Sequence, residues 1–194
     1  MFKRGDFNNY KKEAKFVNLA LEESRNLSFK SSAIYRPKVF LSHKHSDLED
    51  LKGVMGAFEE LGAKIYIDIM DNKMPNETSG ETAERIKDVI KTCKKFVLLA
   101  TKDAIQSYWC NWELGIGDTH KFKDHIAILP MKENGEYDNQ YIGNEYLQIY
   151  PSIEYRDGTG TYRNGKTIIK GFYVKEPMKN GGITITPLND WLNS

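Results

Sequence analysis

The chain has 194 residues and a formal net charge of +1, with 40% hydrophobic and 28% charged residues. This length accommodates one domain with a full core and some additional segments, but not two domains of ordinary size. The composition is that of a soluble globular protein, and so small a net charge provides no large field to attract nucleic acid or acidic lipid. We therefore expect neither a nucleic-acid partner nor a membrane partner.

The sequence also indicates the cellular compartment of the protein and whether it has a structural metal site. Residues 1–9 contain no apolar stretch long enough for a signal peptide, and the apolar runs elsewhere are of strand length. The two cysteines, Cys93 and Cys110, are too few for a disulfide framework and are not spaced as metal ligands. We therefore expect a cytoplasmic protein without a structural metal site, with Cys110 as a small buried side chain.

Residues 1–36 are predicted to precede the main fold. Apolar side chains recur at helical spacing within residues 9–26, at Tyr10, Ala14, Val17 and Leu21. This spacing predicts an amphipathic helix that docks either on the core or on a second subunit of a homo-oligomer. The serine-containing residues 27–37 are predicted to form a linker.

Residues 37–155 alternate between buried strands and amphipathic helices. Strands are predicted at residues 38–42, 64–68, 95–100, 125–130 and 147–150. Helices are predicted from about 46 to 61, from about 79 to 90 and from about 105 to 119. Capping boxes at Ser46–Glu49 and Thr78–Glu81 would begin the first two helices, and Gly62 would end the first. Continuous apolar strands that alternate with helices predict an α/β fold with a doubly wound parallel sheet.

Residues 156–194 are predicted to add a small β extension. Asp157-Gly158 and Asn164-Gly165 are turn signals, and residues 167–174 alternate like an exposed strand. A short helix is predicted to begin at Thr186-Pro187.

The predicted topology indicates where a ligand would bind. In a doubly wound sheet ligands bind outside the carboxyl ends of the strands, where the strand order reverses, here between the first and third strands. Ser42, His43 and Lys44 follow the first of these strands, and Thr101 ends the third. Ser42 and His43 are neighbours on a strand, so their side chains point to opposite faces and cannot form a nucleophile–base pair.

The helix at 105–119 begins beside the same crevice and carries an acidic candidate. Its predicted buried stripe consists of Ile105, Trp109, Trp112 and Ile116. Glu113 is predicted to lie at the edge of this stripe. A carboxylate in such a place is either an ordinary surface residue or a half-buried functional group beside aromatic rings.

Three segments resemble the motifs of TIR domains. Residues 107–114, with the sequence SYWCNWEL, match the S-x-W-C-x-x-E-L signature without a gap. Residues 39–43 and 66–68 resemble the first and second strand motifs of the same family. The resemblance covers about residues 37–155 and implies a five-stranded flavodoxin-like sheet. Among bacterial members the chain is most similar to the TIR signalling component of Thoeris anti-phage systems.

The resemblance implies an activity. In enzymatic TIR domains the glutamate at the position of Glu113 is essential for splitting NAD+, so Glu113 is the expected catalytic carboxylate, NAD+ the substrate, and no cofactor is needed. The residues expected around the substrate are Ser42, His43, Lys44, Asp68 and Trp109. Each has a structural alternative: His43 and Lys44 as solvated loop residues, Asp68 as a strand terminator and Trp109 as a core residue. The product would be ADP-ribose or a cyclised isomer that reaches a downstream effector.

Two departures from the family pattern bear on the contacts expected of the chain, and a rival function stands beside the enzyme. Lys38 stands where many TIR domains have an acidic residue, and residues 71–75 differ from the common R-P-G loop, which argues against the standard contact between TIR domains. The rival is a non-enzymatic module that recruits other TIR domains. Glu113 favours the enzyme, because an adaptor needs no carboxylate beside the crevice.

Overall fold

The computed structural model describes residues 1–11, 36–68, 79–121, 123–133, 144–178 and 181–194. The central parallel strands of its sheet are β2 (Lys38–Ser42), β3 (Lys64–Tyr66), β4 (Lys95–Ala100), β5 (Ile126–Lys132) and β6 (Ser152–Arg156). These strands lie in the order β3-β2-β4-β5-β6. The predicted α/β class and flavodoxin-like order are confirmed, and the strand order reverses between β2 and β4.

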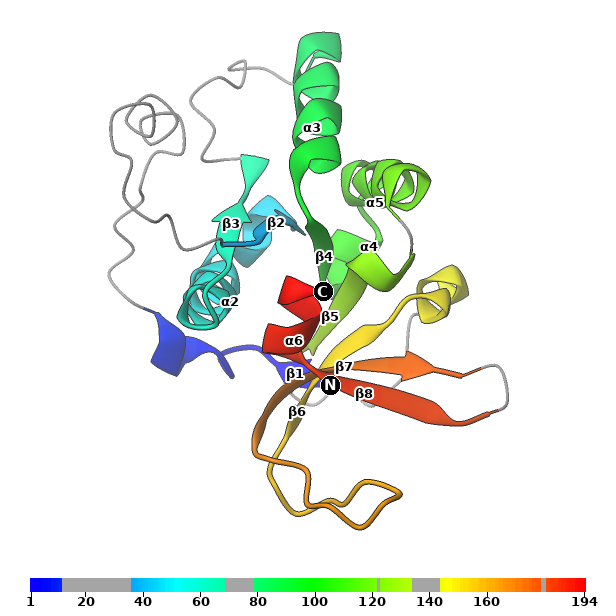
Figure 1. The fold of residues 1–194 in the computed structure, drawn as a ribbon. Helices are drawn as coiled ribbons and strands as arrows, with labels where there is room; N and C mark the ends of the chain where they lie inside the picture. The colour runs from blue at the N-terminus through cyan, green and yellow to red at the C-terminus, as the bar shows by residue number, and fades with distance from the viewer. Residues whose placement is uncertain (12–35, 69–78, 122, 134–143, 179–180) are drawn as a thin grey trace, which may run out of the picture.

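Helices cover both faces of the sheet (Figure 1). One face packs against α2 (Leu48–Glu60) and α6 (Leu188–Asn193). The other packs against α3 (Gly80–Thr92), α4 (Lys102–Ile105) and α5 (Tyr108–His120). Side chains alternate along β2, so that Val39 and Leu41 belong to the first core and Phe40 belongs to the second.

The sheet continues beyond the parallel strands. β7 (Gly171–Pro177) pairs antiparallel with β6, and β8 (Ile183–Pro187) pairs antiparallel with β7. The predicted β extension is therefore a continuation of the central sheet. The strand predicted at 167–174 begins at Gly171, β8 was not predicted, and α6 follows Pro187 as predicted.

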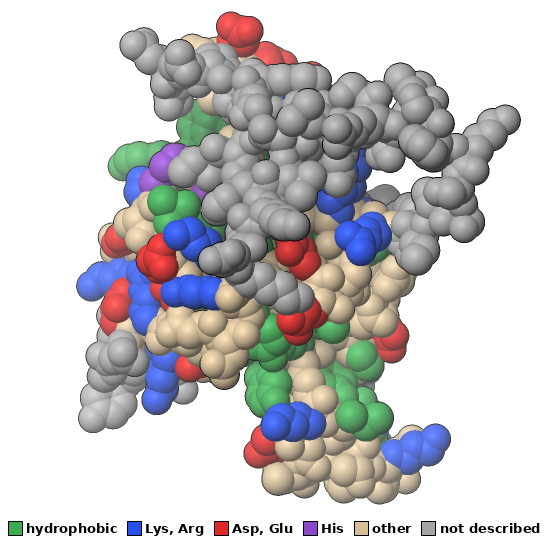
Figure 2. Space-filling view, turned by 90° about the vertical axis from the view of Figure 1, so that its left-hand side faces the viewer, with side chains coloured by type: hydrophobic (Ala, Val, Ile, Leu, Met, Phe, Trp, Pro, Cys, Tyr) green, Lys and Arg blue, Asp and Glu red, His purple; other side chains and the backbone are tan. Residues whose placement is uncertain are grey.

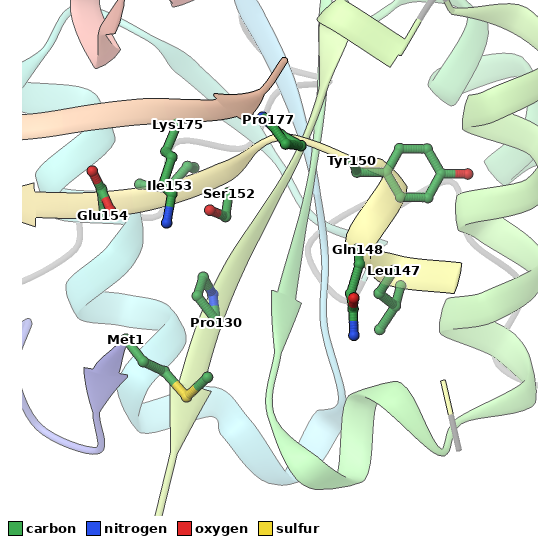
Figure 3. A pocket seen from close by; sticks show the side chains of 10 residues that line it. All are labelled: Met1, Pro130, Leu147, Gln148, Tyr150, Ser152, Ile153, Glu154, Lys175 and Pro177. Atoms are coloured by element: carbon green, nitrogen blue, oxygen red, sulfur yellow. The ribbon is translucent and has the colours of Figure 1, made fainter. Parts of the chain in front are cut away.

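The prediction of a fifth strand at Leu147–Tyr150 is wrong. These residues lie in a 3-10 turn, η5 (Glu145–Ile149), and the fifth strand is β6. Leu147 and Tyr150 are both buried and stand three residues apart, which is the period of a 3-10 helix rather than of a strand. This turn forms one wall of a cavity of about 250 Å³ whose other wall includes Ser152 and Lys175 (Figure 3).

The first two helices begin differently from the prediction. A 3-10 turn, η2 (His45–Asp47), precedes α2, and no capping box of Ser46 and Glu49 forms because both side chains bind elsewhere: Ser46 donates to Asp103 and Glu49 pairs with Lys52. At α3 the capping box shifts by one residue. The side chain of Ser79 accepts from the backbone of Thr82, and the hydroxyl of Thr82 takes the role expected of Glu81.

The helix predicted from about 105 to 119 is α5, which begins at Tyr108, and a short separate helix, α4, precedes it. α4 ends at Ile105, and Ser107 caps α5 by accepting a 3.4 Å hydrogen bond from the backbone N–H of Cys110. The predicted end of the α2 segment near Gly62 is confirmed, since α2 ends at Glu60 and Gly62 has a φ of +82°.

The N-terminal residues form an arm that lies along the main fold. β1 (Phe2–Lys3) pairs parallel with the end of β5, at Met131 and Lys132, and η1 (Asn8–Tyr10) packs on α2. The helix predicted at 9–26 overlaps η1 at Asn9 and Tyr10, whereas Lys11 is extended. Residues 12–26 lie outside the described ranges, as does most of the predicted linker. β1 was not predicted, because a strand of two residues is too short to show a recognisable alternation of side chains.

The distribution of charged side chains on the surface agrees with the small net charge of the chain. On the face shown in Figure 2, acidic and basic side chains of the described residues lie intermingled. Within the described part of the chain, no helix combines the length and the apolar character needed to cross a bilayer.

Candidate active site

Glu113 lies on the buried face of α5. Its side chain is only 2% exposed, and the other buried residues of α5 are Cys110, Leu114 and Gly117. The predicted stripe is therefore rotated: Trp109, Trp112 and Ile116 are only partly buried, and Glu113 lies within the buried face rather than at its edge. Close contact explains the rotation, because a Cβ at Gly117 would come within 3.1 Å of the Phe96 ring on β4.

The carboxyl group of Glu113 meets the end of β2. The hydroxyl of Ser42 donates a 2.5 Å hydrogen bond to Oε2 of Glu113, and the Ser42 side chain is buried as well. Ser42 points to this face because it follows Phe40 by two residues on the strand. The two groups thus meet at the carboxyl end of the sheet, where the strand order reverses.

The environment of Glu113 disfavours its charged form. Burial raises the pKa of Glu113 to about 8, and the nearby negative charge of Asp68 acts in the same direction. Hydrogen bonds from Ser42 and Trp109 act in the opposite direction and stabilise the carboxylate. The group is therefore largely protonated at neutral pH in the empty site, and a positively charged ligand would favour its ionised form.

His43 follows the last residue of β2 and is buried. Its Nδ1 lies 3.2 Å from the carbonyl oxygen of Leu41, so this nitrogen carries the proton in the neutral ring. Its Nε2 lies 3.9 Å from the carboxylate of Asp68 and has no hydrogen-bond partner among the described residues. Burial lowers the pKa of His43, so Nε2 is a buried acceptor beside a second acceptor.

The remaining predicted residues differ in their placement. Trp109 is half-buried, and its ring lies 5.0 Å from that of Trp112, on the turn of α5 before Glu113. Asp68 follows β3 and acts on both Glu113 and His43 through its charge. Lys44 is exposed on the loop after β2. The structure therefore brings Ser42, Trp109 and Asp68 near Glu113, and leaves Lys44 at the surface.

Two residues at the crevice were not predicted as functional. The hydroxyl of Thr101, at the end of β4, donates a 2.6 Å hydrogen bond to the carboxylate of Asp47, which follows β2. Both side chains are buried. Thr101 directly follows β4 and Asp47 lies in the turn after β2, and these positions beside the strand-order reversal are the signal that would have indicated them.

The described residues offer no group of three or more His, Cys, Asp or Glu side chains that could hold a metal ion. Both cysteines are free and buried, and burial raises the pKa of the Cys93 thiol to about 11 and also raises the pKa of Cys110. Cys110 is the small buried side chain that the sequence predicted, and its Sγ donates to the carbonyl oxygen of His43.

Comparisons with known proteins identify chains similar to this one. A curated relative from Bacillus cereus (strain MSX-D12), the "Probable 3' cyclic ADP-D-ribose synthase ThsB'", is 34% identical over 117 residues. The match covers 59% of this chain and 59% of the relative, so the chain spans less than two thirds of that protein. The solved TIR domain of the Toll-related receptor TRR-2 from Hydra magnipapillata is 18% identical with a TM-score of 0.43, over 59% of this chain and 82% of that one.

A family model described as a TIR domain matches residues 39–164. The matched range contains all of β2 but its first residue, the strand-order reversal and the whole of α5, and hence Ser42 and Glu113. Since the match covers more than half of the chain, the chain belongs to the TIR domain family.

Proposed function

We propose that this chain is an enzyme that cleaves the bond between nicotinamide and ribose in NAD+, with Glu113 as the catalytic carboxylate. The observation that carries the proposal is a carboxyl group that is 2% exposed, yet lies at the carboxyl end of the sheet and is held by Ser42. Burying a carboxylate is unfavourable unless another interaction offsets it, and so such groups are frequent at catalytic sites. The name of the Bacillus cereus relative, a cyclic ADP-ribose synthase, supports the same chemistry.

One carboxylate is sufficient for this reaction. Nicotinamide leaves from a pyridinium and takes the bonding electron pair with it, so no general acid is needed, in contrast to ordinary glycosidases with their two carboxyl groups. The ribose carbon becomes positively charged as the bond breaks. The Glu113 carboxylate would stabilise that charge, and more strongly when the substrate excludes water from the site.

The neighbouring residues would hold the substrate and orient Glu113. The Ser42 hydroxyl and the Trp109 side chain both hydrogen-bond the carboxyl group of Glu113 and would orient it toward the ribose. The Trp109 ring would stack on a substrate ring. His43 Nε2 and the Asp68 carboxylate, two acceptors 3.9 Å apart, would accept hydrogen bonds from ribose hydroxyl groups, and Lys44 would contact a phosphate at the rim.

We further propose that the product is a cyclic isomer of ADP-ribose, which acts as a diffusible signal to a downstream effector in anti-phage defence. In that reaction a hydroxyl oxygen of the same molecule attacks the ribose carbon, and the Glu113 carboxylate accepts the proton that the hydroxyl loses. Attack by water would instead yield linear ADP-ribose. The 3' cyclic product in the relative's name favours the cyclic outcome.

The test is the substitution Glu113→Gln. The amide keeps the shape of the side chain but cannot offset positive charge on the ribose, so we expect nicotinamide release to fall by about 10²–10³-fold or more. Products of wild type and variant are separated and identified by mass spectrometry. Glu84→Gln, the same change at an exposed position of α3, is the matched control and should retain full activity.

The rival function, a module that recruits other TIR domains, predicts a different result. Such a module would release no nicotinamide under any condition, and Glu113→Gln would leave its binding to other TIR domains unchanged. If the wild type cleaves NAD+ and an equally stable Glu113→Gln variant does so at a similar rate, Glu113 is not the catalytic group.

A further inference from the structure

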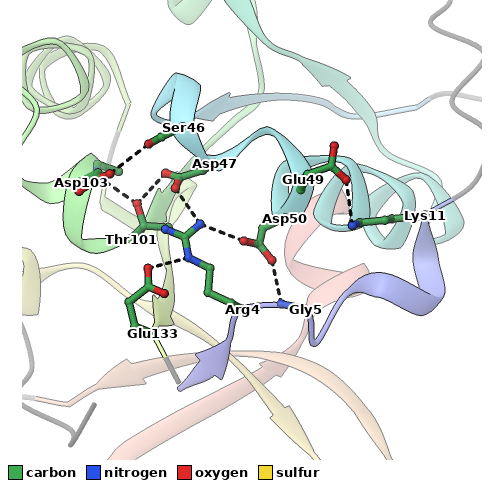
Figure 4. Close-up of polar contacts among 11 residues, drawn as sticks. Arg4, Gly5, Lys11, Ser46, Asp47, Glu49, Asp50, Thr101, Asp103 and Glu133 are labelled. Carbon is green, nitrogen blue, oxygen red and sulfur yellow. Dashed lines mark hydrogen bonds and ion pairs between the residues drawn. The ribbon is translucent and has the colours of Figure 1, made fainter. Parts of the chain in front are cut away.

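Arg4, in the N-terminal arm, is the centre of a polar cluster at the carboxyl end of the sheet (Figure 4). Its Nη1 lies 2.8 Å from Asp47 Oδ1 and 2.9 Å from Asp50 Oδ2, and its Nε lies 2.8 Å from Glu133 Oε1. The side chain of Asp47 is 0% exposed and that of Arg4 is 23% exposed. The guanidinium group therefore neutralises a carboxylate that has no contact with solvent.

Asp47 links the two segments that carry the proposed catalytic pair. Its Oδ2 accepts the hydrogen bond from Thr101 at the end of β4, and its backbone N–H donates to the carbonyl oxygen of Lys44, in the loop that follows Ser42. Thr101 in turn caps α4 by accepting a 3.1 Å hydrogen bond from the backbone N–H of Ala104, and α4 leads directly into α5. The Asp47 side chain thus joins the segment before Glu113 to the loop after Ser42.

A second contact spans the same gap. The hydroxyl of Ser46 donates a 3.1 Å hydrogen bond to Asp103 on α4. This pair is exposed, so it contributes little by itself. The buried Asp47 carboxylate is the stronger connection, and it depends on a cation, because an unpaired buried carboxylate is strongly unfavourable.

The N-terminal arm, which supplies this cation, packs closely against two glycines of α2. A Cβ at Gly53 would lie 2.5 Å from the backbone oxygen of Phe7, and a Cβ at Gly56 would lie 1.9 Å from that of Tyr10. The backbone N–H of Gly5 also donates a 2.8 Å hydrogen bond to Asp50. Two glycines on one face of α2 therefore permit the close approach that brings Arg4 to Asp47.

We propose that Arg4 is a positioning residue of the NAD+-cleaving site. It does not touch the substrate. By neutralising Asp47 it holds the carboxyl ends of β2 and β4 in register, and so it keeps Ser42 at hydrogen-bond distance from Glu113. The proposal rests on the proposed function for its catalytic consequence, whereas its structural consequence is measured without substrate.

The kinetic test compares Arg4→Gln with Arg4→Lys and with Leu192→Ala. Displacement of a catalytic group by about 1 Å can reduce turnover about 10²-fold, so we expect Arg4→Gln to lower kcat by that order while KM changes less than about threefold. Arg4→Lys keeps a cation but not the bidentate geometry, so it should restore kcat only in part, to within about tenfold of the wild type. Leu192→Ala removes a buried side chain of α6 at the opposite end of the sheet, and so it lowers stability without displacing Glu113.

The losses of kcat in Arg4→Gln and Leu192→Ala are compared with account taken of how far each substitution lowers the melting temperature. If Arg4→Gln lowers kcat no more than Leu192→Ala does, Arg4 contributes only stability and the proposal is wrong. If Arg4→Gln does not fold, Arg4→Lys is compared with Leu192→Ala in the same way, with an expected loss of about tenfold.

The structural test is hydrogen–deuterium exchange without substrate. We expect Arg4→Gln to speed exchange in residues 43–47 and 101–107, both remote in sequence from the substitution, while Leu192→Ala leaves both segments protected. Faster exchange confined to residues 1–11 would overturn the proposal. A wild type that cleaves no NAD+ would refute the proposed function, and the exchange data would still decide whether Arg4 orders the two strand ends.

Discussion

At the scale of single residues, the properties of Glu113 follow from its surroundings rather than from its own chemistry. The chain has 27 Asp and Glu residues. Burial raises the pKa of Glu113 far above the usual range for a carboxyl group, and Asp68 adds to the shift. The reactive form of the group, the carboxylate, therefore depends on pH and on the charge of whatever occupies the site.

This shift predicts a pH dependence of the reaction. Because the carboxylate is the reactive form and its pKa in the empty site is about 8, kcat/KM for NAD+ should rise with pH and become constant above about pH 8. The positive charge of the bound substrate favours ionisation, so kcat should reach its plateau at a lower pH than kcat/KM. Initial rates between about pH 6 and about pH 9.5 measure both profiles. A kcat/KM that does not change over this range would contradict the raised pKa.

At the scale of elements, α2 packs against two partners, the sheet and the N-terminal arm. Its apolar side chains, among them Leu51 and Phe58, pack on the sheet, while its glycines accept the N-terminal arm. A glycine inside a helix lowers stability by roughly 1 kcal/mol relative to alanine, so its presence at Gly53 and Gly56 calls for a compensating contact. The backbone of the arm provides that contact.

The packing of the N-terminal arm on α2 predicts whether a substitution at Gly56 raises or lowers the stability of the protein. Gly56→Ala places a methyl group 1.9 Å from the Tyr10 backbone oxygen, so we expect it to lower the free energy of unfolding by about 1–3 kcal/mol despite its better helix propensity. The matched control is Gly115→Ala in α5, whose Cβ meets nothing within 4 Å and which should be stabilising. Urea unfolding of both variants gives the two free energies. A stabilising Gly56→Ala would show that the arm does not pack on α2.

At the scale of the whole molecule, the two termini close opposite ends of the sheet. The arm carries Arg4 to the carboxyl ends of the strands, whereas α6 lies near the start of β4. There Lys94 donates to the carbonyl oxygen of Asn193, and the ammonium of Lys95 lies 4.6 Å from the centre of the Trp191 ring. Segments outside the repeating strand–helix pattern thus complete both ends of the core.

Stability of the whole molecule should respond to the ionisation of Glu113. The folded state binds the proton of Glu113 more tightly than the unfolded chain does, with pKa values of about 8 and 4.5 respectively. The free energy of unfolding therefore falls as pH rises from 4.5 to about 8, and it levels above that range. Gln does not ionise, so the melting temperature of Glu113→Gln should exceed that of wild type by a margin that grows across this window. A margin independent of pH would contradict the buried, protonated state.

Much of the fold could be predicted from the sequence by itself. The strands at 38–42 and 95–100 contain continuous apolar runs, at 39–41 and 96–100, because strands covered on both faces need apolar side chains on both. Both strands were found at their predicted ends. Strand order and the location of the crevice followed from the TIR-like motifs and the general rule for doubly wound sheets. The sequence also indicated a glutamate beside that crevice, because Glu113 occupies a defined position in the TIR-like signature.

Tertiary structure alone decided how deeply Glu113 is buried and what it touches. Periodicity assigned Trp109 and Trp112 to the core, but close packing at Gly117 turned α5 so that Glu113 faces the sheet. The hydrogen bond from Ser42, 71 residues away in sequence, and the ion pair of Arg4 with Asp47, 43 residues away, leave no local pattern. Local sequence patterns report which face of an element is apolar, whereas contacts between distant polar groups depend on how the elements are rotated against one another.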